Sequence, residues 1–299
     1  DSQVSPDSTS FNTVINAWAN SGKIDAPRRA EAILEQMLKA ASEEGERIKR
    51  INPESITFNS VMSAWTKTRS PFAAERCQNI FNRMKDNDTI QPDFVTFNIM
   101  IHAWSLSHRD DAPDQATSIF SEMNRRFEAG NSRMRPNART YGSLINVWSK
   151  SQRPDAGQKA ENYLTQIIQM YDGRPQQRYT NRSSHRKRFR QEEPPRVFEF
   201  TATIRAWLNS GDPNAPLKAD RILYMLLRQV EKGNKKATPD TKLFHTILLT
   251  LSSSKIPNKD IYANRIIQMM IEYKIRPNKF LLDELKRCHE PQETRSQTK

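Results

Sequence analysis

The side chains of this sequence that could bind a metal or act as nucleophiles are few and scattered. They are His102, His108, His185, His245, His289, Cys77 and Cys288. None shows the spacing of a metal site or a CxxC pair, and there is no Gly-x-Ser-x-Gly, phosphate-loop or dinucleotide-binding motif. We therefore expect no catalytic residue, no metal, no cofactor and no small-molecule substrate.

The charge of the chain favours a different kind of chemistry. Lysine and arginine number 47 against 34 acidic residues, a net charge of +13. Such an excess either keeps a protein in solution or attracts a polyanion such as a nucleic acid. No apolar run approaches 18 residues, so we expect no membrane span and no membrane partner.

The ends and the cysteines of the chain suggest where it works. The chain starts at Asp1 without a signal-like segment, so we expect a processed or trimmed chain whose targeting peptide is missing. Two cysteines cannot build a disulfide framework, which favours reduced thiols in an intracellular compartment.

Three stretches of the sequence are nearly the same: SFNTVINAWANS at 10–21, TFNSVMSAWTKT at 57–68 and TFNIMIHAWSLS at 96–107. Copies at such spacings are typical of repeat architectures. The pattern is an aromatic residue, a tryptophan seven residues later, and a small residue twelve further on. Repeats one to six have their aromatic residue at Phe11, Phe58, Phe97, Tyr141, Phe200 and Phe244, and repeat six has Leu251 in place of the tryptophan.

Each repeat predicts two helices. Apolar residues recur at helical spacing in both halves of repeat one: Phe11, Val14, Ile15 and Trp18, then Ala30, Ile33, Leu34 and Met37. The aromatic and tryptophan stripes are therefore expected in the hairpin core rather than stacked on a ligand. The small residue, Cys77 in repeat two, lets the helices pack closely. Length varies only after the second segment, so the extensions are expected to be loops or longer second helices.

The sequence VTFNIMIHAWSLS…A…IFSEM…PN resembles the pentatricopeptide repeat, although the copies here are longer than the family's usual repeat. The tetratricopeptide pattern is absent. The array is P-type-like, and the Ala-Trp ending of the first helix in repeats one, two, three and five resembles algal and protist members. The resemblance implies an all-α, right-handed superhelical solenoid of stacked hairpins over residues 6–290. We expect hairpins at 8–54, 55–93, 94–137, 138–196, 197–240 and 241–278, a partial one at 279–290, and a polar tail at 291–299.

By the same resemblance, the first helices line a groove for single-stranded RNA, with one base per repeat read by two side chains. We call these the reading residue, which follows the aromatic, and the cap residue, which follows the repeat's final proline. The six pairs are Asn12 with Glu54, Asn59 with Asp93, Asn98 with Asn137, Gly142 with Arg196, Thr201 with Asp240, and His245 with Asn278. Asn with Asp implies uracil, Asn with Asn a pyrimidine, and Thr with Asp guanine. Gly142 has no side chain with which to recognise a base, and Arg196 is expected to contact an RNA phosphate.

Simpler roles for these residues stay open. Asp and Asn before a helix are good N-caps, so a cap residue could cap only, or cap and read. The asparagine after each aromatic could be a polar surface residue.

A basic tract at 172–196 holds seven arginines and one lysine against three acidic residues. It could be a solvated loop, a segment that folds onto RNA, or a dock for a ribonucleoprotein. Its candidate contacts to the RNA backbone are Arg182, Arg186, Lys187, Arg188 and Arg190.

The leading hypothesis is sequence-selective binding of single-stranded RNA in a mitochondrion or chloroplast, in transcript processing, stability or translation. The alternative is a helical scaffold subunit of an organellar ribosome or another large assembly. We do not expect an enzyme.

Overall fold

In the computed structural model, residues 6–43, 51–68, 70–87, 90–173 and 193–289 are described, and these residues form helices and connecting loops without a strand. The all-α fold expected from the sequence is confirmed. The chain divides into two compact units, residues 1–147 and 148–299.

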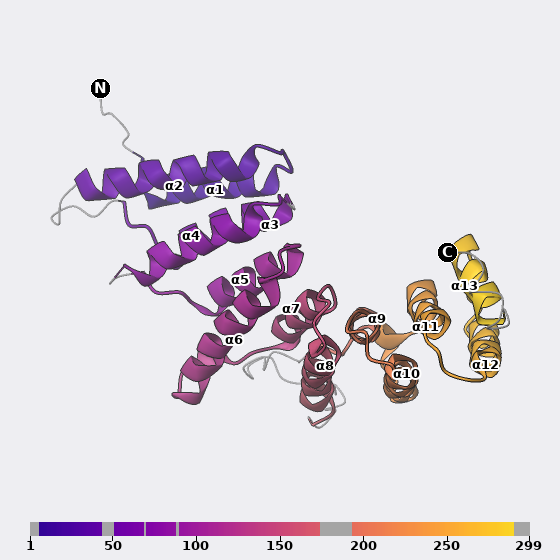
Figure 1. The fold of residues 1–299 in the computed structure, drawn as a ribbon. Coiled ribbons are helices and arrows are strands. Elements are labelled where there is room, and N and C mark those ends of the chain that lie inside the picture. The colour runs from indigo at the N-terminus through magenta and orange to yellow at the C-terminus, as the bar shows by residue number, and fades with distance from the viewer. Residues whose placement is uncertain (1–5, 44–50, 69, 88–89, 174–192, 290–299) are drawn as a thin grey trace, which may run out of the picture. The chain divides into compact units, whose positions relative to one another are not determined.

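The first unit contains three helical hairpins and most of a seventh helix. Its elements are α1 (Ser8–Asn20), α2 (Ala26–Glu43), α3 (Ser55–Lys67), α4 (Ala73–Lys85), α5 (Phe94–Leu106), α6 (Ala112–Glu128), a short 3-10 helix η1 (Ser132–Met134) and α7 (Ala138–Trp148). Figure 1 shows α1 to α6 as successive pairs. The first helices α1, α3 and α5 pack against each other in order, so equivalent residues of successive repeats lie on neighbouring helices.

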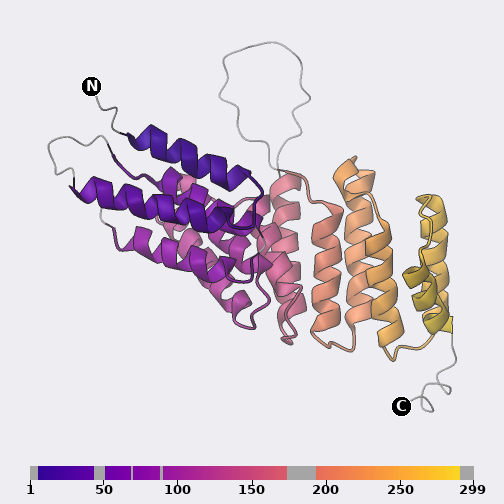
Figure 2. The same cartoon turned by 90° about the horizontal axis from the view of Figure 1, so that it is seen from above.

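The second unit repeats this arrangement. Its elements are α8 (Ala156–Asp172), α9 (Val197–Asn209), α10 (Ala215–Glu231), η2 (Lys235–Ala237), α11 (Thr241–Ser253), α12 (Lys259–Glu272) and α13 (Lys279–His289). Here α9, α11 and α13 pack side by side, as Figure 2 shows for the orange and yellow helices. No helix within the described ranges is both long enough and apolar enough to cross a bilayer.

The core of each hairpin contains the residues that the repeat pattern singled out. The aromatic residues Phe97, Phe200 and Phe244 have no exposed surface. The small residues are equally buried: Ala30, Cys77, Ala116, Ala160, Ala219 and Ala263. Cys77 donates its thiol proton to the carbonyl of Met62, and burial raises the pKa of this thiol. These residues therefore have a packing role.

The extra length of several repeats lies largely in the second helix. α2, α6, α8 and α10 have 17 or 18 residues, whereas α4 has 13. Gly130 and Gly233 end α6 and α10 with positive φ angles of 98° and 87°. The next residue donates its N–H back to the helix in both cases, Asn131 to Arg126 and Asn234 to Gln229, which is the Schellman arrangement.

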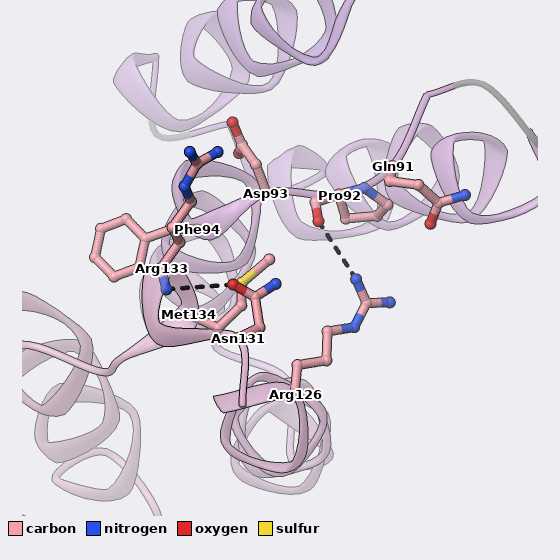
Figure 3. A pocket seen from close by; sticks show the side chains of 8 residues that line it. All are labelled: Gln91, Pro92, Asp93, Phe94, Arg126, Asn131, Arg133 and Met134. Atoms are coloured by element: carbon pink, nitrogen blue, oxygen red, sulfur yellow. Dashed lines mark hydrogen bonds between the residues drawn. The ribbon is translucent and has the colours of Figure 1, made fainter. Parts of the chain in front are cut away.

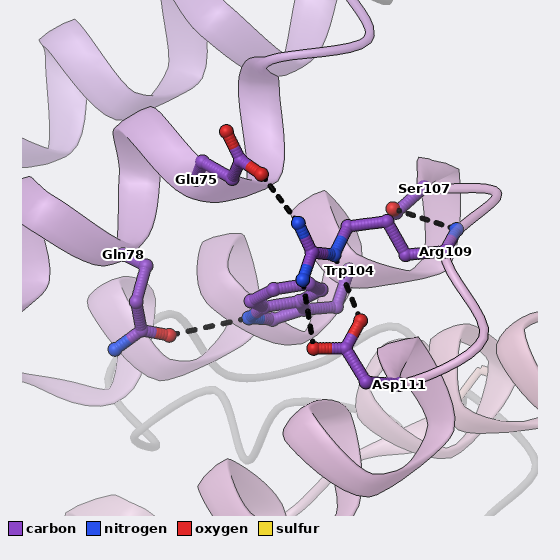
Figure 4. A network of polar contacts seen from close by, with 6 residues as sticks. All are labelled: Glu75, Gln78, Trp104, Ser107, Arg109 and Asp111. Atoms are coloured by element: carbon purple, nitrogen blue, oxygen red, sulfur yellow. Dashed lines mark hydrogen bonds and ion pairs between the residues drawn. The ribbon is translucent and has the colours of Figure 1, made fainter.

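Three of the tryptophans, Trp65, Trp104 and Trp207, also join their repeat to the preceding one. The indole N–H of Trp65 donates to Glu31 at 3.0 Å, that of Trp104 to Gln78 at 3.2 Å, and that of Trp207 to Glu161 at 3.0 Å. All three acceptors directly follow the small residue of the preceding repeat. Figure 4 shows the Trp104 contact beside an ion-pair network in which Arg109 joins Glu75 to Asp111.

We predict that Trp65→Phe lowers the free energy of unfolding by about 1–2 kcal/mol more than Trp148→Phe. Both changes replace a buried indole ring by a smaller phenyl ring, so the loss of buried apolar surface is similar. Trp65 loses its hydrogen bond to Glu31, whereas the indole N–H of Trp148 has no partner among the described residues. Urea titration of the two variants measures the difference, and equal losses would contradict a stabilising role for the indole bond.

We also predict that Gly157→Ala destabilises the chain by about 1–3 kcal/mol, although alanine usually favours a helix. Gly157 lies near the start of α8, and a β-carbon there would overlap the indole ring of Trp207. In a Trp207→Leu background the same change is expected to cost less, and thermal unfolding of the four variants tests this coupling.

Candidate nucleic-acid interface

The six predicted reading residues occupy one structural position. Each is the fifth residue of its first helix: Asn12 in α1, Asn59 in α3, Asn98 in α5, Gly142 in α7, Thr201 in α9 and His245 in α11. Because first helices pack side by side within a unit, reading residues of consecutive repeats lie along one face.

The predicted cap residues stand directly before the next first helix, and four of them cap it. Asp93 accepts the N–H of Thr96 at 2.8 Å, and Asn137 accepts that of Thr140 at 3.0 Å. In the second unit Asp240 accepts from Leu243, and Asn278 accepts from Leu281. Capping is thus one role of these side chains.

In repeat two the reading residue and the cap residue touch. The amide nitrogen of Asn59 donates to Oδ1 of Asp93 at 3.1 Å, although 34 residues separate them. Asn59 is only 6% exposed, and its Oδ1 has no hydrogen-bond partner in the described part of the chain. A buried acceptor without a partner costs about 1–3 kcal/mol until a donor satisfies it.

A hollow of about 400 Å³ opens at this pair. Its lining includes Asn59 and Asp93, the apolar side chains of Ile56 and Val95, and Lys67. Ile56 is 59% exposed and Val95 49% exposed, which is unusual for large apolar residues. The hollow therefore combines apolar side chains with polar groups, one of which lacks a partner.

The sequence analysis did not single out Ile56 and Val95. They stand two residues before the aromatic of their repeats, and Phe198, at the same position in repeat five, is also exposed. In the sequence, the signal that could have identified these residues is an apolar side chain that recurs two positions before the aromatic in repeats two, three and five.

Repeats one and three hold their asparagines differently. Oδ1 of Asn12 accepts the hydroxyl of Thr57 at 2.8 Å, and Oδ1 of Asn98 accepts that of Thr140 at 2.7 Å. Neither asparagine is a freely solvated surface residue, since each contacts the next repeat. Glu54, the cap residue of repeat one, precedes α3, and its N–H donates to the hydroxyl of Thr57 at 3.3 Å.

Repeats four to six offer other groups. Gly142 is buried and has no side chain. The guanidinium of Arg196 binds Glu199 at 2.6 Å, and this hydrogen bond raises the pKa of Arg196. Arg196 was expected at phosphate, and the structure shows it in an ion pair that a phosphate would have to share.

The remaining two reading residues have local partners. Thr201 donates to the carbonyl of Val197, and no hydrogen bond joins it to Asp240 in the described structure. The ring of His245 meets Phe280 edge-on, with 6.4 Å between their centroids.

A second hollow, of about 550 Å³, also has Asp93 in its lining (Figure 3). The guanidinium of Arg126 has partners within the fold, since it donates to the carbonyl of Pro92 and pairs with Glu122. The backbone N–H of Arg133 donates to Asn131. The guanidinium of Arg126 thus joins α6 to the segment that leads into α5, the first helix of the same repeat.

Two further expectations concerned the basic tract and metal-binding side chains. Arg182, Arg186, Lys187, Arg188 and Arg190 of the basic tract lie outside the described residues. Across the described residues, no three histidine, cysteine, aspartate or glutamate side chains are grouped as a metal site would require.

Comparison with known proteins agrees with this architecture. Residues 79–151 match the family model of the pentatricopeptide repeat domain. The crystal structure of the pentatricopeptide repeat protein PPR10 from maize matches with 16% identity and a TM-score of 0.50, over 98% of this chain and 33% of the other. PPR10 in complex with an 18-nt psaJ RNA element matches with 16% identity and a TM-score of 0.48, over 96% of this chain and 38% of the other.

This chain therefore spans about a third of the length of the structures it resembles. No curated protein sequence matches it. Residues 79–151 are therefore similar in sequence to the pentatricopeptide repeat domain, and the helical fold of the chain is similar to that of the maize protein.

Proposed function

We propose that this chain binds single-stranded RNA along the face formed by its first helices, with one base at each repeat that carries a competent reading residue. The observation that carries the proposal is the hollow at Asn59. It joins exposed apolar side chains, Ile56 and Val95, to a hydrogen-bonded amide–carboxylate pair with an unsatisfied acceptor.

The chemistry of this hollow matches that of an unpaired nucleobase. A base has two flat faces, which pack on apolar or aromatic side chains, and a polar edge with donors and acceptors. Ile56 and Val95 supply apolar surface for the faces, and Asn59 supplies groups for the edge. A duplex hides that edge, so only single strands are expected to bind here.

The charge of the chain supports the same ligand. A net charge of +13 attracts the phosphate backbone, and Lys67 brings a cation to the hollow. Lys67 donates to Oδ1 of Asn20 at 2.7 Å, which holds its ammonium group between α1 and α3. The basic tract adds further positive charge, and we propose that it contributes to affinity through phosphates.

The repeats are not equal as readers. Repeats one to three present amides and repeat five a hydroxyl, so we assign base preference to these four. The expected pattern from the RNA 5′ end is pyrimidine, uracil, pyrimidine, any base, guanine, any base. We place the protein in a mitochondrion or chloroplast, acting in transcript processing, stability or translation, as its family resemblance implies.

A scaffold role is the second candidate, and one observation favours it. Leu217 on α10 and Ile261 on α12 occupy equivalent positions and are 50% and 62% exposed, and Tyr224 on α10 is 58% exposed. Exposed apolar side chains at matched positions suit a protein partner. Co-migration of the protein with a large assembly after RNase treatment would favour this role over RNA binding.

We predict that the purified chain binds single-stranded RNA more tightly than duplex RNA of the same sequence. Because phosphate contacts release counterions, the logarithm of the affinity should fall steeply and linearly with the logarithm of salt concentration. Filter binding across a salt series measures both quantities. Equally weak binding to both forms would overturn the proposed function.

A second prediction concerns the fifth base. Thr201→Asn should move its preference from guanine toward uracil, because the new amide stands beside Asp240 as Asn59 stands beside Asp93. One good base contact contributes about 1–3 kcal/mol of discrimination, so the preference should move by about ten-fold or more without a change in salt dependence. Selection from a random RNA pool tests this, with Thr201→Asn combined with Asp240→Ala as the control. If all three proteins select the same fifth base, Thr201 does not read it.

A further inference from the structure

The third residue of each first helix changes together with the reading residue of the preceding repeat. After the asparagines Asn12, Asn59 and Asn98, the third residue of the next first helix is a threonine: Thr57, Thr96 and Thr140. After Gly142, Thr201 and His245 it is Glu199, Leu243 and Leu281. The three threonines have no exposed surface.

A role in capping accounts for only part of this pattern. The hydroxyl of Thr140 accepts the N–H of Asn137 at 3.1 Å, which closes the start of α7. Leucine at the same position in α11 and α13 leaves those helices capped by Asp240 and Asn278. The hydroxyl is therefore not required to start a helix. Its proton also needs an acceptor, and this acceptor differs between the repeats.

At the junction of repeats three and four, the Thr140 hydroxyl has two acceptors within reach, Oδ1 of Asn98 at 2.7 Å and Oδ1 of Asn137 at 3.1 Å, and the shorter contact is to the reading residue. One end of the Asn98 amide lies 2.8 Å from the carbonyl of Phe94, which can only accept, so this end is the NH₂ group. The other end, Oδ1, therefore faces Thr140 at 2.7 Å and accepts its proton. One lone pair of the Asn98 carbonyl oxygen is thereby used, and one N–H of its amide has no partner in the described structure.

At the junction of repeats one and two the arrangement is the same. The hydroxyl of Thr57 accepts the N–H of Glu54 and donates to Oδ1 of Asn12 at 2.8 Å. No hydrogen bond of the Asn12 NH₂ group occurs within the described structure, so Asn12 also offers donors.

At the junction of repeats two and three the proton has another destination. The hydroxyl of Thr96 donates to Oδ1 of Asp93 at 2.8 Å, because a carboxylate is the stronger acceptor. A carboxylate cannot donate, so the end of Asn59 that meets it at 3.1 Å is the NH₂ group. Oδ1 of Asn59, a buried acceptor, is then left without a partner among the described residues.

We propose that Thr57 and Thr140 are positioning residues that set which end of the reading amide is available to the base, and that Asp93 takes over this role for Asn59. The proposal rests on the base-reading function proposed above and specifies how it works. Repeats one and three offer a donor, which suits bases with a ring-nitrogen acceptor, cytosine and adenine. In repeat two the unpaired acceptor, Oδ1 of Asn59, is buried in the free chain, and we propose that a base with a ring N–H, uracil or guanine, satisfies it on binding. Among pyrimidines, the third repeat then selects cytosine and the second selects uracil.

The test compares two threonines that cap alike but donate differently. Thr140→Val removes the hydroxyl that donates to Oδ1 of Asn98, whereas Thr96→Val removes one that donates to the cap residue Asp93. Both lose the contact that closes the helix start, so both are expected to lower the unfolding midpoint similarly. Selection from RNA pools randomised at the second and third bases is carried out with the wild-type chain, both variants and Thr140→Ser.

We expect Thr140→Val to reduce the cytosine-to-uracil ratio at the third base by five-fold or more, since one oriented contact provides about this discrimination. Thr140→Ser keeps the hydroxyl and should keep the ratio. Thr96→Val should leave the second base unchanged. An unaltered third-base ratio in Thr140→Val would overturn the proposal, as would an equal loss at the second base in Thr96→Val, because the hydroxyls would then act through capping alone.

A measurement without RNA separates this proposal from the proposed function. The side-chain amide resonances of Asn98 in the free protein should shift in Thr140→Val and stay in place in Thr140→Ser and Thr96→Val. If the chemical shifts of the Asn98 amide are the same in Thr140→Val as in the wild-type chain, the positioning role is overturned. A wild-type chain without any base preference would instead overturn base reading itself.

Discussion

Burial of the aromatic residue in the first helices of repeats two, three, five and six is the constraint on which the rest of the structure depends. Phe97, Phe200 and Phe244 are inaccessible to solvent, so the rotation of each first helix about its axis is set by its core. The next residue along the helix is the reading residue, and its direction follows from that rotation at about 100° per residue. A surface that recognises anything by hydrogen bonds needs such a fixed direction, and the hairpin core provides it.

Much of this organisation could be predicted from the sequence. Helical spacing of apolar residues predicted two helices per repeat, and prolines at the start of α6 and α10 stand where a missing N–H has no cost. The capping by Asp93, Asn137, Asp240 and Asn278 also followed from residue type and position. These features depend on residues close together along the chain.

The features that could not be predicted depend on how one repeat sits on the next. Nothing local to Asn98 indicates that its amide meets Thr140, because 42 residues separate them. The contact of Asn59 with Asp93 has the same origin. The ion pair of Arg196 is a different case, since Glu199 stands three residues on, at the place of a capping-box glutamate, and could have been recognised.

The lengthened second helices show how a repeat can gain residues without a change to its hairpin core. α6, α8 and α10 exceed α4 by four residues, 17 against 13, which is close to one turn of 3.6 residues. Adding about a whole turn keeps the buried stripe in phase, so the helix grows outward while the hairpin core keeps its register. At α6 and α10 the Schellman glycine then turns the chain back toward the next repeat. Repeat length and ligand recognition are therefore separate variables in this architecture, and the repeats can diverge in size without any change to the face that carries the asparagines.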